Sequence, residues 1–314
     1  MKRYIFKRLL LLIPIVLGIT FLSFAMMRIA GSDAILQQVD ATGIALSQEV
    51  IDARREELGL NQPFLIQYVR WLGGFLTGDL GVSYISGNDV FSTFVSKLPA
   101  TLFLTGSSML LTVIISLPLG ILAAVRQNKF TDYLIRTSSF IGSSLPNFFV
   151  ALLLMYFLSI RLPVFPVISE GINLKSIVLP TLTLGIAMSA RYLRQIRAAV
   201  LEELGKEYVA GEKARGIEFS ATLWKSVLRS CLVTILTLMA LSIGSLLGGT
   251  AIVESIFMWD GVGKLAVDAI NMRDYPVIQA YVVWMAMIYV IVNLATDVIY
   301  RLIDPRIRLE GERR

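Results

Sequence analysis

The sequence predicts an all-α integral membrane protein with six transmembrane helices. Only 17% of the residues are charged and the mean hydropathy is +0.70, whereas soluble domains carry about a quarter charged residues. Six apolar stretches are each close to the roughly 20 residues that a helix needs to cross a bilayer. The net charge of +6 does not indicate nucleic-acid binding, because the basic residues collect at the ends of the apolar stretches, as the positive-inside bias expects.

The six apolar stretches are 9–30, 100–125, 134–160, 176–194, 230–253 and 277–300. The fourth contains Pro180 and Gly185, which are tolerated in a helix that lies inside a bundle. Six spans place both termini on one side of the membrane. The N-terminus, 126–136, 191–229 and the tail after Tyr300 hold 20 Lys and Arg, and the other three connections hold 8. The side with 20 is therefore predicted to be cytoplasmic.

Residues 1–30 are predicted to form an N-terminal signal-anchor transmembrane helix. Lys2, Arg3, Lys7 and Arg8 precede the apolar run, which is the charge pattern of a signal peptide. The run is long enough to span the membrane and lacks an A-x-A cleavage site. We therefore expect it to be retained, with its N-terminus in the cytoplasm.

Residues 31–98 are predicted to form an extracytoplasmic loop region. Ser47–Leu58 has the composition of a soluble helix, and Pro63–Phe75 is an amphipathic helical stretch. The large aromatic residues of the second stretch are Phe64, Tyr68, Trp71 and Phe75. Two interpretations are open: these rings lie at the membrane interface, or the region is a small domain packed on itself.

Residues 99–304 are predicted to form a five-helix core, and residues 305–314 a cytoplasmic tail. Within the core, the cytoplasmic connection 191–229 is 39 residues long, although two helices can be joined by a few residues. The connection is mostly helix-forming, with a break at Gly216, and carries apolar residues among its charges. We expect it to be a docking surface for a partner protein; the alternative is a solvated connector.

The chain lacks the motifs of an enzyme. It has no histidine and one cysteine, Cys231, which excludes a Ser-His-Asp triad and an intramolecular disulfide. Gly261–Lys264 resembles part of a phosphate loop, but it lacks the first glycine and is followed by Leu265. We therefore expect no catalytic residue, no metal and no cofactor in this chain. If ATP drives its activity, a second protein must supply the nucleotide site.

Two further patterns concern helix packing. Gly244 and Gly248 form a G-x-x-x-G motif, followed by Gly249, and small residues of this kind permit close approach of two helices. Asp297 and Arg301 are four residues apart near the end of the last span. We expect them to form an ion pair on one helix face; a proton relay is the alternative.

Three arginines, Arg191, Arg194 and Arg197, line up at intervals of three where the fourth span leaves the membrane. We expect them to reach anionic lipid headgroups. Contact with a partner protein is the alternative.

At the 191–229 connection the chain resembles the permeases of bacterial ABC importers, specifically those of the peptide/nickel family. Those permeases carry an "EAA" loop, in which a short helix followed by a glycine docks into a groove of the ATPase subunit. The stretch Glu207–Ile217 reads EYVAGEKARGI, where peptide-type members usually read close to EYVRTARAKG. Gly211 and Glu212 depart from that pattern.

Other stretches resemble the family in the correct order along essentially the whole chain. They are Tyr4–Leu9, Leu58–Pro63, Trp71-Leu72, Gly78–Gly81 with Ser83, Leu98–Leu102, Val253–Gly263, Arg273–Gln279 and Asp304–Arg308. Asp260 stands where the family usually has proline.

The resemblance implies the fold of a type I ABC importer permease in the bacterial inner membrane, and the first permease of a heterodimeric pair. It implies as partners a second permease chain, two ATP-binding subunits that hold ATP and Mg, and an extracytoplasmic binding protein. The residues that it assigns to the ATPase-coupling loop are Glu207, Tyr208, Val209, Ala210, Gly211, Glu212, Ala214, Arg215, Gly216 and Ile217.

The resemblance leaves the cargo open. The sequence leans toward half of a translocation pathway for nickel or a metal chelate, with dipeptide or oligopeptide import as the alternative. The absence of histidine argues against a bare-metal site in this chain. A membrane scaffold and an intramembrane enzyme are remote alternatives. A scaffold does not need the long cytoplasmic connection, and an enzyme would need polar catalytic groups that face each other inside the spans.

Overall fold

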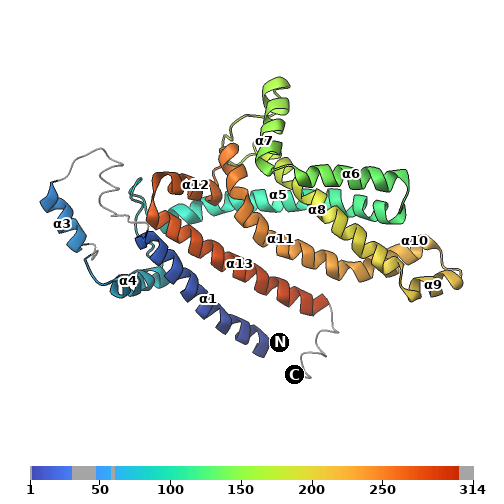
Figure 1. The fold of residues 1–314 in the computed structure, drawn as a ribbon, viewed down its shortest axis with the longest axis horizontal. Helices are drawn as coiled ribbons and strands as arrows, with labels where there is room; N and C mark the ends of the chain where they lie inside the picture. Colours follow the sequence, from blue (N-terminus) through green and yellow to red (C-terminus); the bar gives the residue numbers. More distant parts are fainter. Residues whose placement is uncertain (1, 30–46, 58–60, 304–314) are drawn as a thin grey trace. The chain divides into compact units, whose positions relative to one another are not determined.

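The structure, a computed structural model, describes residues 2–29, 47–57 and 61–303. This part of the chain is helical, and its β-structure is limited to one isolated bridge between Val82 and Asp89. The elements, labelled in Figure 1, are α1 (Lys2–Ile29), α3 (Gln48–Glu57), α4 (Phe64–Thr77), α5 (Val90–Val125), α6 (Phe130–Ser144), α7 (Asn147–Met155), η1 (Tyr156–Arg161), α8 (Val178–Leu204), α9 (Glu207–Ala214), α10 (Phe219–Ala221), η2 (Thr222–Val227), α11 (Leu228–Ile256), α12 (Val262–Met272) and α13 (Tyr275–Ile303). The predicted all-α class is confirmed. The predicted tail, 305–314, lies outside the described residues.

The chain divides into two compact units. Unit 1 consists of Met1–Thr101 and Asp260–Ile291, and unit 2 consists of Leu102–Trp259 and Val292–Arg314. Two helices, Val90–Val125 and the described part Tyr275–Thr296 of α13, are long and apolar enough to cross a membrane, and the bent pair α6–α7 passes the same test as one broken span. The count of six spans remains a prediction.

In unit 1, α4 packs its aromatic face against α1. The ring centroids of Phe64 and Tyr68 lie 5.7 and 5.3 Å from that of Phe21, and Trp71 lies 5.7 Å from Phe24. The Tyr68 hydroxyl is also 3.0 Å from that of Thr20. These rings therefore pack on the first helix, a contact that neither interpretation of the external region specified.

Also in unit 1, the loop before α5 and the first part of α5 itself contact the segments around α12 and α13. Ser83 donates a hydrogen bond from its hydroxyl to Asp274 Oδ2 at 2.5 Å, and the Tyr84 N–H donates to Asp274 Oδ1 at 3.1 Å. The Val262 N–H donates to the Thr101 hydroxyl at 2.8 Å. Segments about 160 to 190 residues apart in sequence are thus joined by specific polar contacts.

In unit 2, α8 packs against both α6 and α11 (Figure 1). The fourth predicted span, 176–194, is part of this one continuous helix. Pro180 lies in the first turn, where its missing N–H has no helical acceptor to lose. Gly185 lies where α5 approaches closely, since a Cβ there would be 2.6 Å from Leu111 Cδ2.

The predicted span 134–160 is not one straight helix. The chain bends by 98° between α6 and α7. Leu145 adopts an extended backbone with φ −83° and ψ 132°. The physical reason is Pro146, because a proline ring disfavours helical backbone in the residue before it.

Candidate functional site

The candidate site is the segment between α8 and α11. Helix α8 continues through Arg191 to Leu204, so the first third of the predicted connection 191–229 belongs to that helix. Helix α9 then runs from Glu207 to Ala214, and α10 and η2 lead into α11. The site is therefore a short helix held between two long ones.

One side of α9 is attached to the body of unit 2. Tyr208 and Val209 pack against a buried cluster that includes Val200, Leu223 and Val227. These apolar contacts reach both the preceding and the following segment, so α9 is fixed to α8 and to η2, which leads into α11.

Polar contacts reinforce this attachment. The Ser226 hydroxyl donates to Glu212 Oε1 at 2.8 Å, across the turn that follows α9. Hydrogen bonds from Thr222 and Ser226 hold the pKa of Glu212 below its usual value. The departure from the family pattern at Glu212 thus has a structural role in this chain.

A second set of polar side chains, Glu203, Lys206 and Tyr208, lies at the start of α9. The Lys206 ammonium is 2.5 Å from Glu203 Oε2. Burial, together with the neighbouring Glu203 carboxylate, raises the pKa of Tyr208 to about 12. Tyr208 is therefore a neutral phenol at physiological pH, suited to a half-buried position.

The other side of α9 is exposed and carries small side chains. Ala210, Gly211, Ala214 and Gly216 are small and exposed, and the charged Lys213 and Arg215 are exposed beside them. A Cβ added at Gly211 would meet no atom within 4 Å, so nothing in the described chain requires glycine there. The small residues leave a low, accessible surface on this side of the helix.

The turn after α9 is a Schellman motif. Gly216 has φ +77°, its N–H donates to Lys213 O at 3.0 Å, and the Ile217 N–H donates to Glu212 O at 3.1 Å. The break that the sequence predicts at Gly216 is therefore a turn with a positive φ. Because a side chain strains this conformation, glycine fixes where α9 ends. Ile217 is 40% exposed directly after the turn.

An open cavity of about 780 Å³ adjoins α9 in unit 2. Apolar residues at the end of α5 and in α8 line it, together with Val209, Ala210 and Phe219. Lys206 and Lys213 add positive charge. The surface beside α9 can therefore accept a protruding apolar group with acidic neighbours.

The prediction for Arg194 and Arg197 is wrong. Arg197 makes a two-pronged ion pair with Asp132 on α6, with both N–O distances at 2.8 Å. Arg194 donates to Ser143 Oγ at 2.8 Å and to Ser139 O at 3.2 Å. Both arginines thus bind α6, a partner that the sequence did not indicate. Arg191 is exposed.

Sequence reasoning missed Asp132, which is fully buried at the start of α6 and also accepts a hydrogen bond from the Asn128 N–H at 3.0 Å. Its only sequence signal was an acidic residue beside an apolar stretch, with no indication of its partner. It missed the Ser83–Asp274 contact in the same way, although both residues lie in family-like motifs.

The predicted packing glycines stay untested. Gly244 and Gly248 lie in α11, and a Cβ at Gly248 would meet nothing within 4 Å in the chain itself. The surroundings of Gly249, Asp297 and Arg301 lie outside what the structure describes. Among the described residues there is no group of three or more Cys, Asp or Glu side chains arranged to hold a metal ion.

Comparison with known protein families finds two models that together match most of the chain. Residues 116–309 match the family model described as "Binding-protein-dependent transport system inner membrane component", and residues 1–105 match the model for the N-terminal part of such components.

Full-length relatives agree with that match. The chain is 38% identical to the oligopeptide transport system permease protein AppB of Bacillus subtilis, over 98% of this chain and 99% of that protein. It is 36% identical to the glutathione transport system permease protein GsiC of Salmonella paratyphi A, with the same coverage. It is 34% identical to the metal-staphylopine import system permease protein CntB of Staphylococcus aureus, over the whole of both chains.

Among solved structures, a chain of the MetNI methionine ABC transporter in an inward-facing conformation matches with a TM-score of 0.57. The match covers 68% of this chain and 96% of that chain, at 17% identity. At this identity the likeness shows the fold, and it confirms the predicted permease fold.

Proposed function

Because the chain belongs to the family of binding-protein-dependent transport system inner membrane components, we propose that it is the first permease of a heterodimeric ABC importer. Members of this family are components of transport systems and not enzymes, which agrees with the prediction that this chain is not an enzyme. A second permease chain would supply the other half of the translocation pathway. Both termini and α9 would lie in the cytoplasm, on the side with 20 of the Lys and Arg residues.

The observation that carries the proposal is the two-sided character of α9. Its inner side is fixed to α8 and to η2, and its outer side includes small exposed residues. A rigidly held helix whose outer side includes small side chains can approach the walls of a groove on another protein closely. We assign that groove to an ATPase subunit.

The attachment also explains how force would be transmitted. A movement of the ATPase would displace α9, and the contacts of Tyr208, Val209 and Glu212 would carry that displacement to α8 and α11. ATP and Mg would be bound by two ATPase subunits, not by this chain. A binding protein would deliver cargo on the opposite side of the membrane.

For the cargo we propose a peptide-sized organic molecule, either an oligopeptide or a metal chelate. The named cargoes of the relatives support this class, since they are an oligopeptide, glutathione and a metal–staphylopine complex. The leaning toward nickel is retained in the form of a chelate, in which the organic ligand coordinates the metal.

Two measurements test the proposal. The purified chain alone should show no ATP hydrolysis, whereas purification from cells that express the whole importer should bring down an ATPase. Stoichiometric ATP turnover by the isolated chain would contradict the permease assignment. Purification without an ATPase would favour the scaffold or enzyme alternatives.

The cargo is tested by uptake into proteoliposomes that contain the complete importer. Labelled oligopeptide, labelled nickel with a chelator and labelled nickel alone are supplied in parallel. Uptake of either of the first two would support the class. Uptake of nickel alone at the same rate as nickel with the chelator would exclude a peptide-sized organic cargo.

A further inference from the structure

A groove of about 650 Å³ lies in unit 2, between the end of α5 and the start of α11. Its floor belongs to the buried cluster that includes Ile121, Leu228 and Ile235. Leu232 also lines the groove and is 47% exposed. An open apolar groove of this size is large enough for part of a small ligand or a lipid chain, and exposed apolar surface of this kind marks a contact with something outside the chain.

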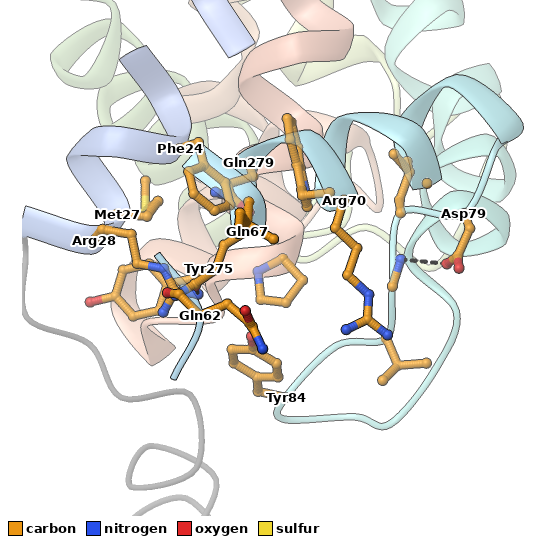
Figure 2. Close-up of a pocket in the computed structure, with 17 residues that line it drawn as sticks. Phe24, Met27, Arg28, Gln62, Gln67, Arg70, Asp79, Tyr84, Tyr275 and Gln279 are labelled. Carbon is orange, nitrogen blue, oxygen red and sulfur yellow. Dashed lines mark hydrogen bonds between the residues drawn. The ribbon is translucent and has the colours of Figure 1, made fainter. Parts of the chain in front are cut away.

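The cavity of about 630 Å³ in unit 1 is different in character. Figure 2 shows that its wall mixes aromatic rings with the amides of Gln62 and Gln67 and the carboxylate of Asp79. The described residues that line the groove in unit 2 are apolar except for the indole of Trp224 and two cations, Lys225 and Arg229, and none of them is acidic. The groove therefore combines an apolar surface with positive charge.

The two cations stand at the η2 end of the groove. Lys225 lies in η2 and Arg229 in the first turn of α11, so they are about one helical turn apart and share a face. Within the part of the chain that the structure describes, neither side chain makes an ion pair or a hydrogen bond. Glu212 contacts the same turn through Ser226, but it does not line the groove. The charge at this end is therefore open to an anionic group from outside the chain.

The π-helical turn η2 places an aromatic ring at the mouth of the groove. Thr222, Leu223 and Val227 are buried, whereas Trp224 is 67% exposed. A π turn holds more residues than an α turn and is frequent at functional sites. Because Trp is enriched where a membrane meets water, Trp224 indicates that this end of the groove lies at headgroup depth.

The apolar part of the groove has the dimensions of a lipid chain within one leaflet. Leu228, Leu232 and Ile235 lie at positions i, i+4 and i+7 of α11, so they form a stripe on one helix face. At a rise of 1.5 Å per residue the stripe is about 10 Å long, which fits within the roughly 15 Å of one leaflet. Cations, an indole and an apolar stripe thus follow one another in the order of a phospholipid's own parts.

We infer that this groove binds an anionic phospholipid of the cytoplasmic leaflet. The headgroup phosphate would lie beside Lys225 and Arg229, and an acyl chain would lie along the apolar stripe. The choice of leaflet rests on the proposed function, because η2 packs against α9, which we place in the cytoplasm. Basic residues just cytoplasmic of a spanning helix are the pattern that anionic headgroups favour. The bound lipid would join α5 to the turn that holds α9.

The test uses the complete importer purified in detergent and native mass spectrometry with two probes, phosphatidylglycerol and phosphatidylcholine with the same acyl chains. Wild type should bind the anionic lipid more tightly. Lys225→Gln combined with Arg229→Gln should weaken phosphatidylglycerol binding about tenfold and leave phosphatidylcholine binding unchanged. Arg126→Gln combined with Lys129→Gln is the matched control, because both are exposed cations that do not line the groove. It should bind both lipids as wild type does.

A charge-preserving variant completes the series. Lys225→Arg combined with Arg229→Lys keeps both cations and should bind phosphatidylglycerol as wild type does. Equal phosphatidylglycerol binding by wild type and the Lys225→Gln, Arg229→Gln variant would overturn the inference. A tenfold loss in the charge-preserving variant would also overturn it, because the effect would then not be one of charge.

A second measurement distinguishes a lipid from a protein partner. In a Cys231→Ser background, Leu232→Cys in the assembled importer in proteoliposomes should react with a membrane-soluble maleimide, because Leu232 is exposed and a lipid can exchange. Protection of this cysteine would mean that another subunit covers the groove. Faster reaction with a water-soluble maleimide would mean that the groove faces water. Either result would make the lipid assignment wrong.

Co-purification of an ATPase is recorded for wild type and every variant. An intact complex in which the Lys225→Gln, Arg229→Gln variant binds lipid as wild type does would defeat the lipid inference alone. Absence of an ATPase from the wild-type preparation would instead contradict the proposed function.

Discussion

Arg197 on α8 grips Asp132 on α6 with two hydrogen bonds of 2.8 Å, and the Asp132 carboxylate is completely buried. Helix α8 runs directly from this ion pair to α9. The pair therefore fixes the helix that supports the proposed ATPase-docking surface.

The first prediction follows from this ion pair. Asp132→Asn removes the negative charge and leaves Arg197 without its counter-ion, so it should destabilise the protein by about 3 kcal/mol. Arg191→Gln is the control, because Arg191 is exposed on the same helix. Thermal unfolding of the detergent-solubilised importer measures both. An unchanged melting temperature in Asp132→Asn would show that the pair contributes little.

The second prediction concerns the Gly216 turn. Gly216→Ala places a Cβ at φ +77° and should cost about 1 kcal/mol in the turn. Gly216→Asp and Ala214→Asp should leave the protein inserted but reduce ATPase co-purification and cargo uptake. Protein level, co-purification and uptake are measured for each variant.

Gly211→Ala separates folding from docking. It adds a methyl group into open space in the chain itself, so the protein level should be normal. A loss of ATPase co-purification in this variant would indicate a groove that fits closely over α9. Normal uptake by Gly216→Asp and Ala214→Asp at wild-type protein levels would defeat the docking assignment.

The third prediction concerns Glu212. Its folded-state pKa lies below the usual 4.5 because Thr222 and Ser226 donate to the carboxylate. Such a group stabilises the folded state above its unfolded pKa and loses that contribution as the pH falls through its folded pKa. Amide exchange at Gly216 and Ile217 should therefore quicken below about pH 4.5. Ser226→Ala should reduce this pH dependence, and Ser220→Ala, an exposed neighbour, should preserve it.

The fourth prediction concerns orientation. In a Cys231→Ser background, Asn88→Cys should react with a membrane-impermeant thiol reagent added from outside, and Lys213→Cys should not. Both replaced side chains are exposed, so reactivity depends on the side of the membrane and not on burial. The reverse labelling pattern would overturn the charge-based topology.

The sequence alone predicted those features that depend on local chemistry. Apolar runs of spanning length fixed the helical class, and the basic residues at their ends indicated an orientation. The helix break at Gly216 was predictable because few residues other than glycine adopt a positive φ without strain. The helices at Gln48–Glu57 and Phe64–Thr77 were predicted for the same reason, since amphipathic spacing is a local property.

Only the tertiary structure decided which side chains meet. The spacing of Arg194 and Arg197 is equally compatible with headgroups, a partner or another helix, and the choice depends on α6, which lies about 50 to 65 residues earlier in the chain. The partner of α4 was open too, because only its contacts with Phe21 and Phe24 show what its aromatic face packs against. Periodicity places a residue on a face of its own helix, but the energy of burial depends on the surface opposite, and that surface is assembled by distant parts of the chain.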